Sequence, residues 1–214
     1  MTTLLINAHP DFQNDQHYSA KLAQRFLEHY QAAFPEQTVD VLNLYGTEIP
    51  QLTTTALLGV WRKQAQHVTL TPDEQHTAAV NHQLLAQFKA HHRIVIVSPL
   101  HNFNVTARLK DYLDNILVAR ETFRYTEAGS VGLMTDDYRV LLLQASGSVY
   151  TRQDRYNPME FSRLYLDKMF TEVMGFDTFD IVRIQGTQTH GVRIDDAIQA
   201  GYRDLDAAFT RFYR

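Results

Sequence analysis

The stretch RIVIVSPLHNFN, residues 93–104, decides the fold. Its core, Ile94 to Val97, is apolar and entirely β-branched, which predicts a strand buried on both faces of a sheet. Pro99 ends this strand, and a polar loop then leads into a helical pattern at residues 106–120. A buried strand that passes through a short loop into a helix is typical of a parallel α/β sheet.

Further strand patterns recur along the chain and alternate with helical patterns; residues 39–44 (VDVLNL) alternate between apolar and polar side chains rather than forming an apolar run. Further strands are expected at residues 3–8, 39–44, 139–144 and 179–184. Further helices are expected from Ser19, as an N-cap, to about residue 33, and at residues 72–91, 160–174 and 193–213. The alternation predicts a parallel sheet with right-handed crossovers and helices on both faces.

Two segments do not fit the alternation. Residues 46–71 show no clear period, and because plain loops of this length are uncommon, a partly helical excursion is expected there. Residues 122–138 contain two glycines and alternating residues, which predicts a hairpin or an extended loop. Neither segment has the composition of a linker, so residues 1–214 are expected to form a single domain.

Composition excludes several classes of protein. With 44% hydrophobic residues over 214 positions, the chain has the apolar content of a globular protein rather than a disordered one. Cysteine is absent, which excludes disulfides, thiolate metal sites and a cysteine nucleophile. A net charge of −4 gives no reason to expect nucleic acid as a partner. No apolar run approaches a membrane span, and the first residues lack the basic start of a signal peptide, so we expect a cytoplasmic protein.

Three loops follow strands that would end at one edge of the sheet, where doubly wound proteins bind ligands. The first carries His9, His17, Tyr18 and Ser19 and runs into a helix N-terminus, which favours a phosphate. It contains neither G-x-G-x-x-G nor a P-loop pattern, so a Rossmann turn and a nucleoside-triphosphate loop are disfavoured. A plain polar loop with a capping serine remains the alternative.

The other two loops suit a flat, polar ring. In the loop at residues 99–104, Asn102 and backbone amides can hydrogen-bond a heterocycle, and Phe103 can cover its face. In the loop at residues 145–150, small side chains allow a ring to approach the backbone. Each loop alone is also consistent with an ordinary turn, and the joint occurrence of all three favours a ligand site.

The segments PLHNFN at residues 99–104, with Leu109-Lys110-Asp111-Tyr112 beyond it, and TFRYTEAGSVGL at residues 122–133 resemble a known family. The chain is similar to the flavodoxin-fold NAD(P)H-dependent flavin oxidoreductases, in the group of FMN-dependent NADH-azoreductases and quinone reductases. The resemblance implies a flavodoxin-like three-layer sandwich around a five-stranded parallel sheet. It also implies bound FMN and a homodimer with the active site at the interface.

Site residues follow from the resemblance position by position. The implied flavin-binding residues are His9, His17, Tyr18, Ser19, Pro99, Leu100, His101, Asn102, Phe103, Ala145, Ser146, Gly147 and Ser148. Tyr125 is expected in the substrate pocket, and Tyr150 is a candidate proton donor. Azoreductases usually carry serines in place of His9 and His17, and the start NAHP resembles related quinone reductases, so FAD stays open beside FMN.

The leading hypothesis is an enzyme that transfers a hydride from NADH or NADPH through the flavin N5 to a quinone or an azo compound, by a ping-pong mechanism. Two other classes are kept. One is a flavin-binding ancillary regulatory subunit of a membrane transport system with secondary quinone reductase activity. The other is a one-electron carrier, against which the modest charge of −4 argues. No metal site is expected, because only His9, His17 and His101 could converge without a carboxylate partner evident from the spacing.

Overall fold

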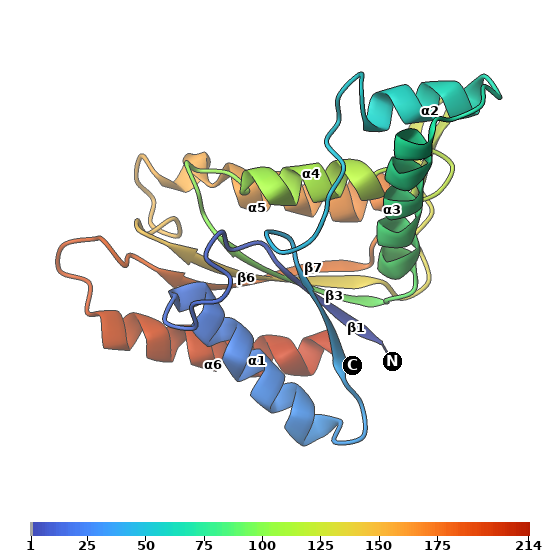
Figure 1. Cartoon of the computed structure of the whole chain (residues 1–214). Helices are drawn as coiled ribbons and strands as arrows, with labels where there is room; N and C mark the ends of the chain where they lie inside the picture. The colour runs from blue at the N-terminus through green and yellow to red at the C-terminus, as the bar shows by residue number, and fades with distance from the viewer. Residues whose placement is uncertain (1) are drawn as a thin grey trace.

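A computed structural model describes residues 2–214 and contains a five-stranded parallel sheet in the order β2-β1-β3-β6-β7 (Figure 1). The strands are β1 (Thr3–Asn7), β2 (Val39–Asn43), β3 (Arg93–Pro99), β6 (Arg139–Ser146) and β7 (Thr178–Gln185). All five expected strands are confirmed, and each observed end lies within two residues of its predicted position.

Helices cover both faces of the sheet, as expected for a three-layer sandwich (Figure 1). Helices α1 (Tyr18–Ala33) and α6 (Ile194–Phe212) lie on one face. Helices α3 (Pro72–Lys89), α4 (Ala107–Ile116) and α5 (Phe161–Asp167) lie on the other. Each face of the sheet therefore carries its own apolar cluster of buried residues.

Local sequence explains where these helices start and which side they bury. Leu22, Phe26 and Tyr30 are spaced four residues apart on α1, and all three are buried against the sheet. Helix α3 begins with a capping box, in which the Thr71 hydroxyl accepts the Glu74 N–H and the Glu74 carboxylate accepts the Thr71 N–H. These reciprocal bonds satisfy two amides that the first turn leaves unpaired.

The segment 46–71 is the expected partly helical excursion. It contains α2 (Leu57–Ala65), which lies beyond the sheet and contacts α3 (Figure 1). Polar side chains connect this segment to α3 and α4. The Trp61 indole N–H donates to Asn81 Oδ1 at 3.1 Å, and Asn81 Nδ2 donates to Asn115 Oδ1 at 3.0 Å. Asn115 Nδ2 in turn donates to the Pro50 carbonyl at 2.7 Å.

The segment 122–138 contains the expected hairpin, made of β4 (Phe123–Thr126) and β5 (Gly129–Gly132). The backbone of this hairpin contacts the backbone of residues 174–175 directly. A Cβ on Gly132 would lie 2.3 Å from the Met174 carbonyl carbon, so no side chain fits there. The Met134 N–H donates to the Met174 carbonyl at 2.8 Å, two residues beyond the hairpin.

Three details differ from expectation. The helix predicted at residues 160–174 is α5 followed by a π-helical segment, η2 (Lys168–Met174), and a short 3₁₀ turn, η1 (Asn157–Met159), precedes it. The helix predicted at residues 106–120 stops at Ile116. The N-cap of α1 is His17, so the prediction that Ser19 caps this helix is wrong. Within residues 2–214, no helix combines the length and the apolar character that crossing a membrane requires.

The polar network of the excursion yields a stability prediction. Asn115→Leu keeps the number and branching of the side-chain heavy atoms but removes the donor of the buried Pro50 carbonyl, so we expect a loss of about 2–3 kcal/mol in the free energy of unfolding. Urea unfolding measures it. Gln83→Leu, on the exposed side of α3, is the control and should change the free energy by less than about 0.5 kcal/mol. Equal effects of the two changes would contradict the assignment.

Candidate functional site

The three loops that the sequence singled out meet at the carboxyl edge of the sheet and enclose a cavity of about 170 Å³. The lining residues are His9, His17, Tyr18, Ser19, Pro99, Leu100, Ala145, Ser146, Gly147 and Thr187. All but Thr187 were predicted. Thr187 follows β7, and its only signal in the sequence is that position after a strand.

The N-terminus of α1 opens into this cavity without a cap. No side chain accepts a bond from its first turn, and that turn carries no acidic residue. The Ser19 hydroxyl is buried, with the residue only 1% exposed, and it has no hydrogen-bond partner in the described part of the chain. A helix N-terminus with free amides and an unpartnered hydroxyl is suited to an anion.

Two imidazoles stand beside this helix end. The rings of His9 and His17 stack with their centroids 3.9 Å apart. Asp11 contacts both rings, because its N–H donates to His9 Nδ1 at 3.1 Å and its carboxylate lies 2.9 Å from His17 Nε2. Burial, and next the charge of His17, lower the pKa of His9 below its ordinary value.

The loop after β3 contains a tight turn in a rare conformation. The N–H groups of His101 and Asn104 each donate to the other residue's carbonyl at 3.0 Å. Between them, Asn102 and Phe103 have φ angles of 47° and 66°, as in a type I′ turn. Asparagine tolerates this left-handed region, whereas phenylalanine pays about 1–2 kcal/mol for it. Strain held at a loop beside a cavity points to a functional segment.

Phe103 connects this turn to an aromatic cluster. Its ring lies 6.4 Å from that of Tyr150, edge to face, and 6.5 Å from that of Tyr156. Tyr150 is buried, and burial raises the pKa of its hydroxyl above its ordinary value. Neither Phe103 nor Tyr150 lines the cavity.

In the loop after β6, three backbone carbonyls accept hydrogen bonds, whereas two backbone amides have no acceptor among the described residues. The carbonyls of Ser146, Gly147 and Ser148 accept the N–H groups of residues 186–188 in the loop after β7. The amides of Gly147 and Ser148 have no acceptor among the described residues. Gly147 is not required by packing, because a Cβ there would meet only Gln188, at an ordinary 3.5 Å. Gly147 itself lines the cavity.

A buried charge network anchors the end of β6, and sequence analysis missed it. Glu160 accepts two hydrogen bonds from Arg183, at 2.8 and 2.7 Å, and one from Gln144 at 2.8 Å. Ser162 donates to Gln144 Oε1 at 2.8 Å. Because Gln144 immediately precedes the cavity loop, this network fixes where that loop begins.

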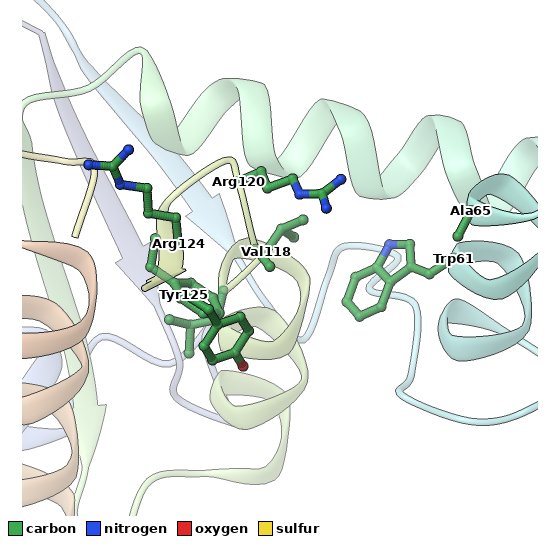
Figure 2. A pocket seen from close by; sticks show the side chains of 9 residues that line it. Trp61, Ala65, Val118, Arg120, Arg124 and Tyr125 are labelled. Carbon is green, nitrogen blue, oxygen red and sulfur yellow. The ribbon is translucent and has the colours of Figure 1, made fainter. Parts of the chain in front are cut away.

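A larger cavity, about 770 Å³, lies between α2 and the end of α4 (Figure 2). Its lining residues are Trp61, Ala65, Leu117, Val118, Ala119, Arg120, Phe123, Arg124 and Tyr125. Figure 2 shows the Trp61 indole on one side and Tyr125 on the other, with Val118 between them. Tyr125 is 76% exposed. The two cavities share no lining residue, so one chain does not bring Tyr125 to the first cavity.

In the described part of the chain, no three or more His, Asp or Glu side chains are grouped so that they could hold a metal ion.

The fold and the carboxyl-edge cavity define a flavodoxin-like α/β protein. In agreement, the sequence model of the family described as "Flavodoxin-like fold" matches residues 1–209, and the chain belongs to this family. Its relatives narrow the class to the FMN-dependent NADH:quinone oxidoreductases and NADH-azoreductases.

The similarity to these relatives extends over the whole chain. It is 71% identical over 211 residues to FMN-dependent NADH:quinone oxidoreductase 1 of Lactiplantibacillus plantarum, covering 99% of this chain and 98% of the relative. It is 47% identical to the enzyme of that name from Streptococcus agalactiae, covering 100% and 99%. The crystal structure of an FMN-dependent NADH-azoreductase from Bacillus anthracis in complex with FMN superposes with a TM-score of 0.94, at 41% identity and full coverage of both chains.

The unpartnered hydroxyl gives a prediction for the ligand-free chain. Ser19→Ala removes a buried group without a partner, so the free energy of unfolding should stay equal or rise by about 1 kcal/mol. Ser162→Ala is the matched control, because this buried serine donates to Gln144, and it should lose about 1 kcal/mol. Urea unfolding of both variants compares them. An equal loss in both would mean that Ser19 has a partner in the free chain.

Proposed function

We propose that this protein is an FMN-dependent NADH:quinone oxidoreductase that also reduces azo compounds. The observation that carries the proposal is the unpartnered Ser19 hydroxyl, buried in a cavity at the uncapped start of α1. A phosphate at this point would satisfy the hydroxyl and the free amides together. The names of the relatives point to FMN as the phosphate-bearing group.

Each loop has a part in holding the cofactor. His9, His17, Tyr18 and Ser19 would bind its phosphate. Pro99, Leu100, His101, Asn102 and Phe103 would hold the flavin ring, and Ala145, Ser146, Gly147 and Ser148 its polar edge. The free amides of Gly147 and Ser148 can donate hydrogen bonds to negative charge on that edge. The carbonyls of the same loop already accept hydrogen bonds from residues 186–188.

FMN, when bound, supplies the hydride chemistry between nicotinamide and acceptor. The chain contributes orientation, and it keeps proton donors near the ring. Tyr150 is proposed as one such donor, since a tyrosine hydroxyl is protonated at neutral pH and its ring contacts that of Phe103 in the loop after β3. We propose a ping-pong order, in which NADH donates its hydride and leaves as NAD+ before the quinone or azo compound binds. We also propose a cytoplasmic location, where NADH is supplied.

The position of Tyr125 supports a homodimer. This residue is exposed on the hairpin, beside a wide cavity that is separate from the cofactor cavity of its own chain. A second copy of the chain would place a hairpin and its Tyr125 over the neighbouring flavin, and there line the acceptor site. The acceptor pocket would then be complete only in the dimer.

The first test is the absorption spectrum of the purified protein, with chromatography of the heat-released cofactor. We expect a flavin band, release of FMN rather than FAD, and quinone reduction with NADH preferred over NADPH. A protein that soaking with FMN and FAD leaves colourless would refute the proposal. A flavoprotein without turnover that co-purifies with a transport protein would instead support a regulatory role.

The turn after β3 gives a test of ring binding. Asn102→Ala and Asn102→Gly both remove the side-chain amide, but glycine keeps the left-handed conformation without strain. We expect each to weaken FMN binding by about 1–3 kcal/mol, measured by flavin fluorescence. If Asn102→Gly binds FMN as tightly as the unmodified chain, the side chain does not contact the ring.

Tyr125 gives a test of the acceptor site. Tyr125→Ala should raise KM for the quinone severalfold while FMN retention stays unchanged, since the residue lies outside the cofactor cavity. Steady-state kinetics measure the first quantity and the flavin-to-protein absorbance ratio the second. Light scattering shows whether the variant remains a dimer. An unchanged KM in an intact dimer would remove Tyr125 from the acceptor site.

A further inference from the structure

The cofactor cavity contains no permanent positive charge. Among the described residues that line it, none is Lys or Arg, and none is Asp or Glu. Only His9 and His17 can become cationic. Phosphate sites in proteins usually gain much of their affinity from Arg or Lys. Here any full positive charge facing the phosphate has to come from a histidine that takes up a proton.

The two imidazoles are placed so that their protonation is coupled. Their ring centroids are 3.9 Å apart, and the planes differ by 24°. Two cations at this separation repel each other strongly. Asp11 compensates one of them through its contact with His17 Nε2 at 2.9 Å. Asp11 contacts both rings, because its N–H also donates to His9 Nδ1. Since Nδ1 accepts this hydrogen bond, the proton of the neutral His9 ring is on Nε2.

Among the described residues that line the cavity or contact the two rings, the other titratable groups are Asp11 and Tyr18, both on the same loop and helix start. The residues that line the cavity from β3, β6 and β7 are Pro99, Leu100, Ala145, Ser146, Gly147 and Thr187, and none of them titrates. The lowered pKa of His9, caused by burial and then by the charge of His17, agrees with a pair that resists a second proton while no anion is present.

We infer that His9 and His17 determine the specificity of this site for a phosphate monoester, by taking up a proton when the phosphate binds. This inference rests on the proposed function, since it concerns the same cofactor cavity. A phosphate monoester carries a charge of about −1.5 to −2 near neutral pH, which offsets the repulsion between two protonated rings. The bound state therefore holds more protons than the free state, and lower pH favours it.

The alternative is that the α1 N-terminus and Ser19 bind the phosphate without help from charge. Backbone amides and a hydroxyl do not titrate in this range, and a phosphate monoester loses negative charge as pH falls toward its second pKa of about 6. That arrangement therefore predicts a phosphate affinity that does not rise toward pH 6.5. The two possibilities therefore differ in one measurable quantity, the pH dependence of the preference for FMN over riboflavin. Riboflavin has the same ring without the phosphate, so the ratio of the two dissociation constants isolates the phosphate contribution.

The experiment uses the full chain stripped of flavin, with FMN and riboflavin as probes between pH 6.5 and 8.5. Quenching of flavin fluorescence gives the two dissociation constants. We expect the preference for FMN to rise at least about tenfold from pH 8.5 to 6.5, while riboflavin binding stays constant. Titration calorimetry in two buffers of different ionisation heat should show uptake of about one proton per FMN at pH 7.5. A preference that changes less than about twofold, without proton uptake, would overturn the inference.

Variants locate the effect. His9→Gln and His17→Gln keep a polar side chain but cannot become charged, so each should reduce the pH dependence and the double variant should abolish it. His82→Gln, on the exposed side of α3, is the matched control and should retain it. Far-UV circular dichroism shows whether each variant is folded. Retention of the full pH dependence by the double variant would overturn the inference even if FMN binds. If neither flavin binds the unmodified chain at all, the proposed function fails with it.

Discussion

Strand β1 hydrogen-bonds to β2 on one side and to β3 on the other, in a register that places Asn7 beside both Asn43 and Val97. Strands β1 and β2 therefore end level, and β3 continues two residues farther, to Pro99. Because parallel crossovers are right-handed, the chain leaves β1 toward one face of the sheet and leaves β3 toward the other. The two loops diverge at this point, and the carboxyl-edge cavity lies between them. The positions of α1, α4 and the lining residues of these two loops follow from these pairings.

The strands could be predicted because their burial shows in the local sequence. A strand covered by helices on both faces has no polar side, so runs such as residues 94–97 are apolar throughout. Nine of the lining residues could be predicted because they are close to such apolar runs in the sequence. They lie directly after a run or, in the first loop, between a run and the first turn of the helix that follows it. Each loop alone was also consistent with an ordinary turn, and the family resemblance added the prediction that these residues bind a flavin.

What was missed depends on contacts between distant parts of the chain. Thr187 reaches the cavity because β7 pairs with β6 in a register that places Gln185 beside Ser146. The buried network of Glu160 forms only when three elements meet, and no local pattern marks it. Ser19 was read as a cap because a serine near a helix start fits that role. Its actual position, two residues inside the helix, leaves the hydroxyl free for a ligand.

The close packing of Gly132 has a mechanical consequence. With no side chain between them, the hairpin and the π-helical segment touch backbone to backbone, and the Met134 N–H bonds to the Met174 carbonyl nearby. At this contact no flexible side chain lies between the two backbones, so a movement of one backbone cannot be accommodated by a change of side-chain rotamer. The π-helical segment therefore cannot shift without also displacing the hairpin. Because Tyr125 is part of this hairpin, its position is coupled to the backbone that follows α5.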